Sequence, residues 1–289
     1  MATDGRGLQR SASGEENAVQ LVGRCAIFPV HPSPPQRSKL SILELPLLYC
    51  HYIQNGLIYS LKPKHDFESA LELLRKSLSE VLVFFYPLAG RLTTLADGVI
   101  YVDCNDAGVE FIEASADSLS VAEIIASDVP PVVKQLFALN GALNLEGHSL
   151  PLLAVQVTKL RDGLSVGCTL NHAIADGASL WHFFNSWAQL CKLGIPINTP
   201  LPIHDRSGIS LKDSTIRMNL DPAGDIPRVY PPLLRVKFFH FKRETIEALK
   251  ERANRQASKT SRLSVGTCGR PSHEHGAWRP TNARSLESQ

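Results

Sequence analysis

The sequence predicts a fold of the α/β class, in which strands and helices share one core. Two segments repeat apolar residues every three or four positions, as amphipathic helices do. Several other segments place short apolar runs on both sides of turn residues, as strands do. With 289 residues, 44% of them hydrophobic, the chain is long enough for a large core and for one or two domains.

The first elements are expected to be extended. Residues 19–30 form a strand-like run, and the proline-rich residues 31–35 prevent it from pairing further. Residues 40–61 are mostly apolar and are interrupted at Pro46 and Gly56. This pattern fits a short helical turn followed by an extended segment, but it does not settle where one gives way to the other.

Two amphipathic helices are predicted with defined ends. Asp66 is a good N-cap residue, and the apolar residues after it repeat at helical spacing until Pro87 and Gly90 end the pattern. A second helix follows Asp176 and is expected to stop at Gly194. The apolar residues on its buried face are Leu180, Phe183, Phe184, Trp187, Leu190 and Cys191.

Two β-hairpins are predicted from paired runs around turn residues. The first joins 99–103 to 109–113 across an Asn-Asp-Ala-Gly turn. The second joins 152–160 to 164–170 across Arg-Asp-Gly. The second hairpin leads directly into the segment that carries the most chemistry.

Composition and charge exclude several classes of protein. The formal net charge is +2, so electrostatics favours neither a nucleic-acid partner nor a membrane surface. No apolar run reaches the roughly 18 residues of a membrane span, and the first residues contain no apolar signal core. Six cysteines are spread out without a Cys-x-x-Cys pair, which predicts reduced thiols and a cytoplasmic location.

His172 is the first candidate for chemistry. It follows the apolar run 164–170 almost directly, so it is expected at the end of a strand, at a sheet edge where a reacting group is commonly placed. An imidazole titrates near neutral pH and can therefore take a proton from an alcohol or an amine. The alternative is a buried histidine whose nitrogens are satisfied by backbone groups, and the residues alone leave both interpretations open.

Asp176 and Gly177 follow the histidine and have more than one interpretation. An aspartate here is an ordinary N-cap for the next helix, and it can also orient the loop that carries the histidine. A metal site shared by His172 and Asp176 is not expected, because the preceding strand and Gly177 argue against a helix through them and no third ligand is near. Cys168 is expected to be buried in the strand, with a thiol nucleophile as the remaining alternative.

Short motifs along the chain occur in a recognisable order. Residues 172–177 read His-Ala-Ile-Ala-Asp-Gly, and further motifs lie at 40–44, 85–92, 103–109 and 202–206. Together they resemble the plant BAHD acyl-CoA-dependent acyltransferases, whose signature is His-x-x-x-Asp-Gly. The first of these motifs carries Glu44 where the family has aspartate. The signature alone is also shared by condensation domains and chloramphenicol acetyltransferases, so the order of the five motifs carries the resemblance.

The resemblance implies a mixed sheet flanked by helices, as in chloramphenicol acetyltransferase, with the active site in a channel between two such domains. It implies that His172 is the general base that takes a proton from a hydroxyl or amine acceptor, which then attacks the thioester of acyl-CoA. Asp176 and Gly177 would be structural and orienting. Acyl-CoA and a small acceptor from plant specialised metabolism would be the only partners of a monomer, with no bound cofactor and no metal.

The match departs from the family toward the end of the chain, where the family's Asp-Phe-Gly-Trp-Gly motif is absent. A second domain is expected to begin with a strand over 234–241 and a helix over 244–253 and then to stop. The expected organisation is a disordered N-terminus (1–17), an acyltransferase domain (18–194), a linker (195–232), the start of a second domain (233–254) and a disordered, non-family tail (255–289).

An incomplete second domain has a consequence for activity. The channel would lack one wall, which predicts weak acyl transfer or none, and the exposed apolar face would favour self-association. The alternative function is therefore a truncated half-molecule without turnover, which is inert or acts by binding a partner or an acyl group.

Overall fold

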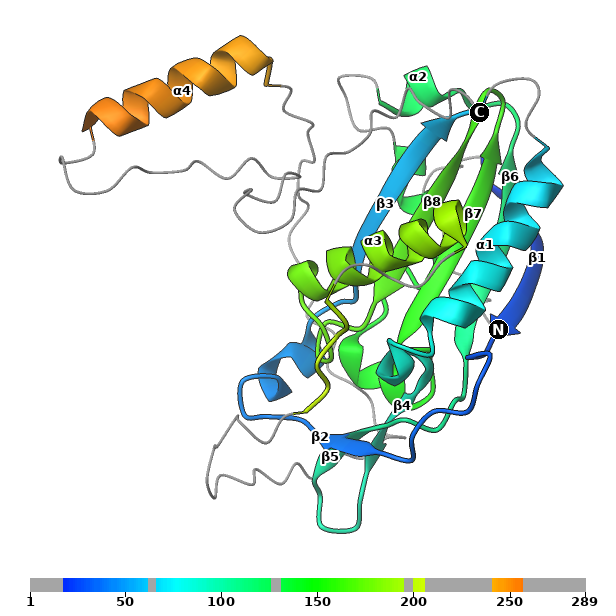
Figure 1. Cartoon of the computed structure of the whole chain (residues 1–289), viewed down its shortest axis with the longest axis vertical. Coiled ribbons are helices and arrows are strands. Elements are labelled where there is room, and N and C mark those ends of the chain that lie inside the picture. The colour runs from blue at the N-terminus through cyan, green and yellow to red at the C-terminus, as the bar shows by residue number, and fades with distance from the viewer. Residues whose placement is uncertain (1–17, 62–65, 126–130, 195–199, 206–240, 257–289) are drawn as a thin grey trace, which may run out of the picture.

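Two β-sheets form the frame of the part of the chain that the computed structural model describes, which comprises residues 18–61, 66–125, 131–194, 200–205 and 241–256 (Figure 1). The strands are β1 (Gln20–Ile27), β2 (Arg37–Lys39), β3 (Ile53–Ser60), β4 (Arg91–Thr94), β5 (Ile100–Asp103), β6 (Val109–Ala116), β7 (Leu153–Leu160) and β8 (Gly163–Leu170). The α-helices are α1 (Phe67–Val81), α2 (Val121–Ile124), α3 (Gly177–Leu193) and α4 (Arg243–Gln256). The short 3₁₀ helices are η1 (Leu45–Tyr49), η2 (Tyr86–Ala89), η3 (Pro131–Leu136) and η4 (Asn144–His148).

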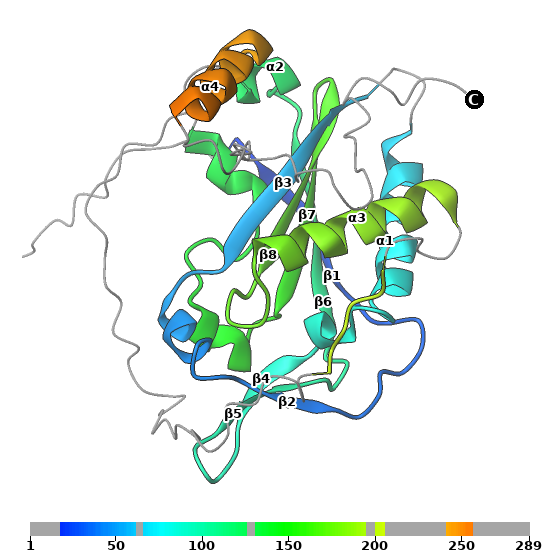
Figure 2. The same cartoon turned by 60° about the vertical axis from the view of Figure 1, so that its left-hand side comes forward.

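The larger sheet is mixed and has helices on its face. Its strand order is β1-β6-β7-β8-β3, and of these neighbours only β6 and β7 run parallel. Helices α1 and α3 lie over the same face of this sheet, as Figures 1 and 2 show from two sides. The predicted fold class, a mixed sheet flanked by helices, is therefore confirmed.

Apolar stripes on the two helices form the main core with the inner strands. Helix α1 begins where the sequence predicts, because the carboxylate of Asp66 accepts hydrogen bonds from the backbone N–H groups of Glu68 and Ser69. The fully buried indole of Trp187 on α3 donates to the hydroxyl of Ser77 on α1 at 3.0 Å, which ties the helices together. Large side chains of this core include Trp187, Phe183 and Phe184 from α3, Leu71, Leu78 and Leu82 from α1 and its end, and Phe111 from β6.

The central strands are covered on both faces. Every residue of β8 is buried, and so are all residues of β7 except Lys159. Helices α1 and α3 cover one face, and Leu136, Ala138 and their neighbours cover the other. Burial on both faces explains why these strands read as nearly continuous apolar runs. The predicted β7–β8 hairpin is confirmed, with Lys159 paired with Leu164 at its turn.

The predicted hairpin between 99–103 and 109–113 is wrong. Strand β5 belongs to a separate three-stranded sheet, in the order β2-β5-β4, whereas β6 lies between β1 and β7 in the larger sheet. Both edges of β5 are occupied by β4 and β2, so no edge is left for β6. The turn residues instead carry the chain from one sheet to the other, with positive φ angles of 52° at Asp106 and 88° at Gly108. The guanidinium of Arg91 holds this corner by donating to the carbonyl of Gly108 at 2.8 Å.

Several other elements of the chain are also predicted from the sequence. The first strand is confirmed as β1, and residues 40–61 form η1 and then β3. The helix predicted over 244–253 is confirmed as α4. Helix α3 ends at Gly194, which has a left-handed φ of 59°. The N-terminus, most of the linker, nearly all of the strand predicted over 234–241 and the tail beyond Gln256 lie outside the described residues.

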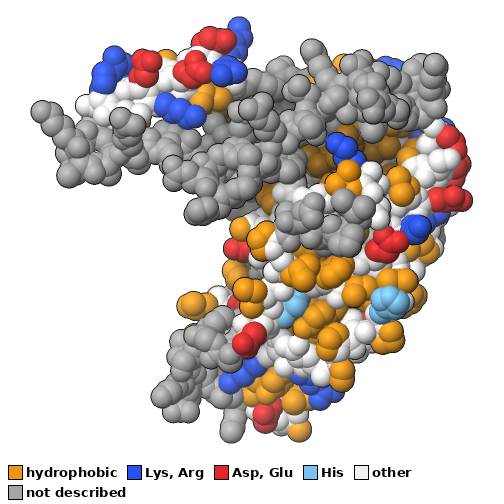
Figure 3. All heavy atoms as spheres, viewed as in Figure 1, with side chains coloured by type: hydrophobic (Ala, Val, Ile, Leu, Met, Phe, Trp, Pro, Cys, Tyr) orange, Lys and Arg blue, Asp and Glu red, His pale blue; other side chains and the backbone are white. Residues whose placement is uncertain are grey.

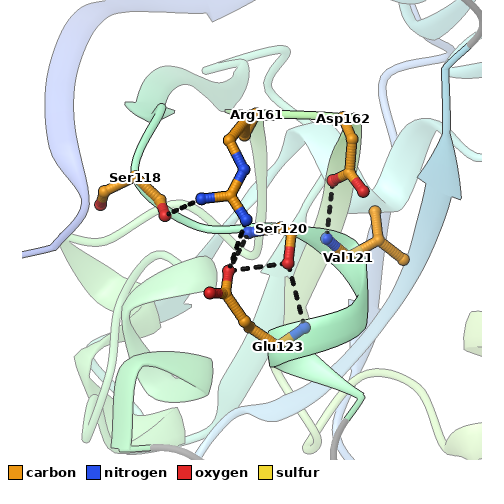
Figure 4. A network of polar contacts seen from close by, with 6 residues as sticks. All are labelled: Ser118, Ser120, Val121, Glu123, Arg161 and Asp162. Atoms are coloured by element: carbon orange, nitrogen blue, oxygen red, sulfur yellow. Dashed lines mark hydrogen bonds and ion pairs between the residues drawn. The ribbon is translucent and has the colours of Figure 1, made fainter.

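A polar network joins helix α2 to the turn between β7 and β8 (Figure 4). Ser120 and Glu123 form a capping box, in which the backbone N–H of Ser120 donates to the Glu123 carboxylate at 2.6 Å. Arg161 donates to the same carboxylate at 3.2 Å, and Asp162 accepts from the backbone N–H of Val121 at 2.8 Å. Exposed pairs of this kind add little stability, so the network mainly sets the position of α2.

None of the helices in the described residues is long and apolar enough to cross a membrane.

The close contact between β3 and β8 predicts a site where no side chain is tolerated. A Cβ atom on Gly163 would lie 2.2 Å from the carbonyl oxygen of Tyr59 and 2.6 Å from Val121. Gly163→Ala is therefore expected to lower the free energy of unfolding by about 1–3 kcal/mol, measured by urea denaturation. Gly23→Ala is the matched control, because its new Cβ would meet nothing nearer than 3.7 Å. Equal urea midpoints for Gly163→Ala and the wild type would contradict this account of the packing.

Candidate active site

His172 lies in the loop that joins strand β8 to helix α3, and it is half-buried. Its Nδ1 atom lies 3.0 Å from the backbone carbonyl oxygen of Ala175. A carbonyl can only accept, so this contact assigns the ring proton to Nδ1 and leaves the lone pair on Nε2. The described residues include no hydrogen bond to Nε2. The ring is therefore oriented by its own loop with a basic nitrogen available.

Asn144 holds the backbone of this loop from behind. Its side chain has no solvent exposure, and its Oδ1 atom accepts a hydrogen bond from the backbone N–H of His172 at 2.7 Å. Its Nδ2 atom donates to the carbonyl of Leu47 at 2.7 Å and to that of His51 at 3.3 Å. One amide thus connects the histidine loop to η1 and to the start of β3.

Asn171 supports the loop from within. It is also fully buried, and its Nδ2 atom donates to the carbonyl of Asn144 at 2.8 Å. Its Oδ1 atom accepts from the backbone N–H of Ala173 at 3.1 Å, which closes a tight turn. Packing here is close, because a Cβ atom on Gly147 would lie 2.6 Å from Asn171 Nδ2. Burial raises the pKa of neighbouring Tyr52 to about 12, although a hydrogen bond with Asn171 acts in the opposite direction.

Asp176 acts at the start of helix α3. Its carboxylate is exposed and accepts a hydrogen bond from the backbone N–H of Ser179 at 2.8 Å, so the N-cap prediction is confirmed. The bonds to Ser179 hold the pKa of this carboxyl below its ordinary value, and His172 makes only a small further contribution. Gly177 is the first residue of α3, and a Cβ atom there would meet nothing within 4 Å among the described residues.

The histidine loop lies where two hydrophobic clusters meet. Ala173 is buried in a cluster formed mainly by η1, the smaller sheet and η4, and Leu47 packs against it. Ile174 contacts both this cluster and the main core. Figure 3 shows hydrophobic side chains gathered at the surface on the face that α3 crosses. The loop that carries His172 therefore packs against apolar side chains through Ala173 and Ile174.

The structure bears on two questions that the sequence left open, the role of Cys168 and the burial of His172. Cys168 has no solvent exposure, and burial raises the pKa of its thiol, so it is not placed to act as a nucleophile. His172 combines features of both of its interpretations, because a backbone group satisfies Nδ1 while the ring remains half-buried.

Among the described residues, no group of three or more His, Cys, Asp or Glu side chains could hold a metal ion.

Sequence reasoning missed Asn144 and Asn171. Asn171 left a weak signal, because it is a polar residue between a buried strand and the candidate histidine. Asn144 left no such signal, because residues 117–150 show no clear period. Asn144 also lies 28 positions before His172 in the sequence. Only the fold brings the two amides together.

Comparison with known proteins agrees with this fold. The model of the transferase family matches residues 17–268. BAHD acyltransferase DCR of Arabidopsis thaliana is 39% identical over 259 residues, which are 82% of this chain and 53% of that protein. Hydroxycinnamoyl-CoA:5-hydroxyanthranilate N-hydroxycinnamoyltransferase HHT1 of Avena sativa is 40% identical over 146 residues, which are 50% of this chain and 32% of that protein.

A solved structure agrees as well. The crystal structure of vinorine synthase has a TM-score of 0.60 and 28% sequence identity, and the match covers 83% of this chain and 57% of that one. The family model and this structural match thus identify the mixed sheet under two helices as a transferase fold. The chain belongs to the transferase family and, within it, to the BAHD acyltransferases. It spans about half the length of the curated relatives that it matches over most of its own length.

The cap at Asp176 predicts a pH-dependent contribution to stability. Because the folded-state pKa of this carboxyl lies below its ordinary value of 3.8, the contribution is present above about pH 4 and is lost as the pH falls below that value. Asp176→Ala is expected to lower the free energy of unfolding by about 1 kcal/mol at pH 7.

Urea denaturation at pH 7 and at about pH 3 tests this expectation. The difference between Asp176→Ala and the wild type should shrink at the lower pH. Asp176→Asn retains a capping oxygen without the charge and serves as the control, so its difference from the wild type should also shrink at the lower pH, where neither cap is ionised. A difference that is as large at low pH as at pH 7 would show that the charge on this carboxyl does not contribute.

Proposed function

We propose that this chain transfers an acyl group from acyl-CoA to a hydroxyl or amine of a small acceptor, with Nε2 of His172 as the general base. Membership of the BAHD acyltransferases supports the reaction class. The observation that carries the role of His172 is the bond from its Nδ1–H to the carbonyl of Ala175, which leaves the basic nitrogen on the other side of a half-buried ring. An imidazole held in this tautomer is ready to accept a proton near neutral pH.

The proposed reaction proceeds by acyl transfer through a tetrahedral intermediate. Nε2 removes the proton from the acceptor as the acceptor oxygen or nitrogen forms a bond to the thioester carbonyl carbon. The C–S bond then breaks, the acyl product leaves, and the imidazolium returns its proton to the coenzyme A thiolate. While the ring is positively charged, the carbonyl of Ala175 continues to accept from Nδ1 and stabilises that charge.

The proposed substrates follow from the family and from the surroundings of the loop. The Avena sativa relative is named for a hydroxycinnamoyl-CoA donor and an amine acceptor, and we extend the donor class, a CoA thioester, to this chain. Leu47 and Ile174 are partly buried apolar side chains of the clusters against which the histidine loop packs, and such side chains suit an aromatic or aliphatic acyl group or acceptor. Asp176 and Gly177 would have a structural role at the start of helix α3, where the loop ends, without touching substrate.

Replacement of His172 tests the proposal. His172→Ala is expected to lower kcat by about 10²–10⁴-fold, because the base is lost. The release of free coenzyme A thiol would be measured for the purified chain with a panel of acyl-CoA donors and with phenol, alcohol and amine acceptors. No turnover by the wild-type chain with any pair, or equal turnover in wild type and His172→Ala, would contradict the proposal.

Two matched variants serve as controls for this experiment. His182→Ala removes another imidazole, which contacts Phe85 and the carbonyl of Pro200, and turnover should be retained. Cys168→Ala removes the buried thiol of β8 and should also retain turnover. Loss of turnover in Cys168→Ala with normal folding would instead assign the chemistry to the thiol.

A further inference from the structure

The orientation of the His172 ring depends on the shape of its own loop. The partner of Nδ1 is the carbonyl of Ala175, only three residues away, so this bond forms only while the loop keeps its shape, and it does not tie the loop to the rest of the fold. The ring is fixed relative to the sheet only if other groups hold the loop. The contacts that leave the loop therefore show which residues position the imidazole.

Asn144 makes two of these contacts. Its side chain accepts from the backbone N–H of His172 at 2.7 Å, and its backbone carbonyl accepts from the side chain of Asn171 at 2.8 Å. Two consecutive residues of the loop are thus bound by one residue that has no solvent exposure. Hydrogen bonds in such a dry environment are strong, and leaving one of their groups unpaired is costly.

Asn144 is itself held on its other side. Its Nδ2 atom donates to the carbonyls of Leu47 and His51, and its backbone N–H donates to the carbonyl of Cys50 at 2.9 Å. Helix η4, which begins with Asn144, is pressed against the loop at Gly147, where a side chain would collide with Asn171. The hydrogen bonds of Asn144 therefore hold the histidine loop in a fixed position relative to η1 and η4.

The carboxylate of the family motif makes a different contact. Asp176 is exposed, and its hydrogen bond runs to the backbone N–H of Ser179 within helix α3. Its effect is on the start of the helix, four residues beyond the ring. We propose that Asn144, rather than Asp176, is the residue that positions His172 for proton transfer; this inference rests on the function proposed above.

A double-mutant cycle on the whole chain tests the proposal by kinetics. Asn144→Ala is expected to lower kcat by about 10–100-fold with KM for acyl-CoA and acceptor nearly unchanged, because the base is misplaced while the substrates still bind. In a His172→Ala background, Asn144→Ala should cause no further loss, because a residue that acts through the imidazole has no effect once the imidazole is gone. Losses that multiply in the double variant would assign Asn144 a merely structural role and overturn the proposal.

A matched control separates the site from a general loss of stability. Asn140→Ala removes an exposed asparagine four positions away that also makes side-chain hydrogen bonds, to Lys134 and Gln54, and kcat should stay at the wild-type value. Asn144→Ser is a second variant in case the alanine variant does not fold. All assays would be run well below the melting temperatures, with folding checked by circular dichroism.

A second readout does not depend on turnover. With ¹⁵N-labelled histidine, NMR of the wild-type chain is expected to show His172 as the Nδ1–H tautomer, and its signal is identified by its absence in His172→Ala. In Asn144→Ala or Asn144→Ser the ring should lose this single tautomer. Retention of the pure Nδ1–H form in both variants would refute the positioning role.

The two proposals fail in different ways. If His172→Ala leaves turnover unchanged, the general-base function fails, and the NMR experiment still decides whether Asn144 orients the ring. If His172→Ala abolishes turnover but the effects of the two substitutions on kcat multiply in the double variant, the general-base function is supported and the positioning role of Asn144 is refuted.

Discussion

Two asparagine side chains with no solvent exposure must find all of their hydrogen bonds within the protein, and the histidine loop is built around that requirement. Asn144 and Asn171 bind each other, the backbone of the loop and the carbonyls of Leu47 and His51. A buried polar group left without a partner costs about 1–3 kcal/mol. The end of β8, η1 and η4 are therefore constrained to move as one unit, and His172 is part of that unit.

The hydrophobic cores place this polar unit at a boundary. Helices α1 and α3 pack on one face of the five-stranded sheet, and the three-stranded sheet forms a second cluster with η1 and η4. Ile174 belongs to both clusters, so the loop passes through the seam between them. A seam position keeps the backbone of the loop rigid and still leaves the imidazole half-buried, which a position inside either core would not allow.

The motif carboxylate of Asp176 and the buried amides of Asn144 and Asn171 stabilise opposite ends of the histidine loop. Asp176 satisfies the free backbone N–H of Ser179 in the first turn of α3, where a negative charge also interacts favourably with the helix dipole. The amides satisfy groups on the strand side. A family signature marks the residues that are close in sequence, but the contacts that fix the ring come equally from η4, which is distant in sequence from the histidine.

The sequence by itself determined the class of the fold, both packed helices with their caps at Asp66 and Asp176, the β7–β8 hairpin and the candidate base. These features depend on local periodicity and on residues that cap or turn the chain, and such signals are visible within a few positions. Only the tertiary structure decided that β5 and β6 enter different sheets, because strand pairing depends on which edges are already occupied. It alone also revealed Asn144, because a buried amide is recognised by partners that lie far away along the chain, and no local pattern of residues records them.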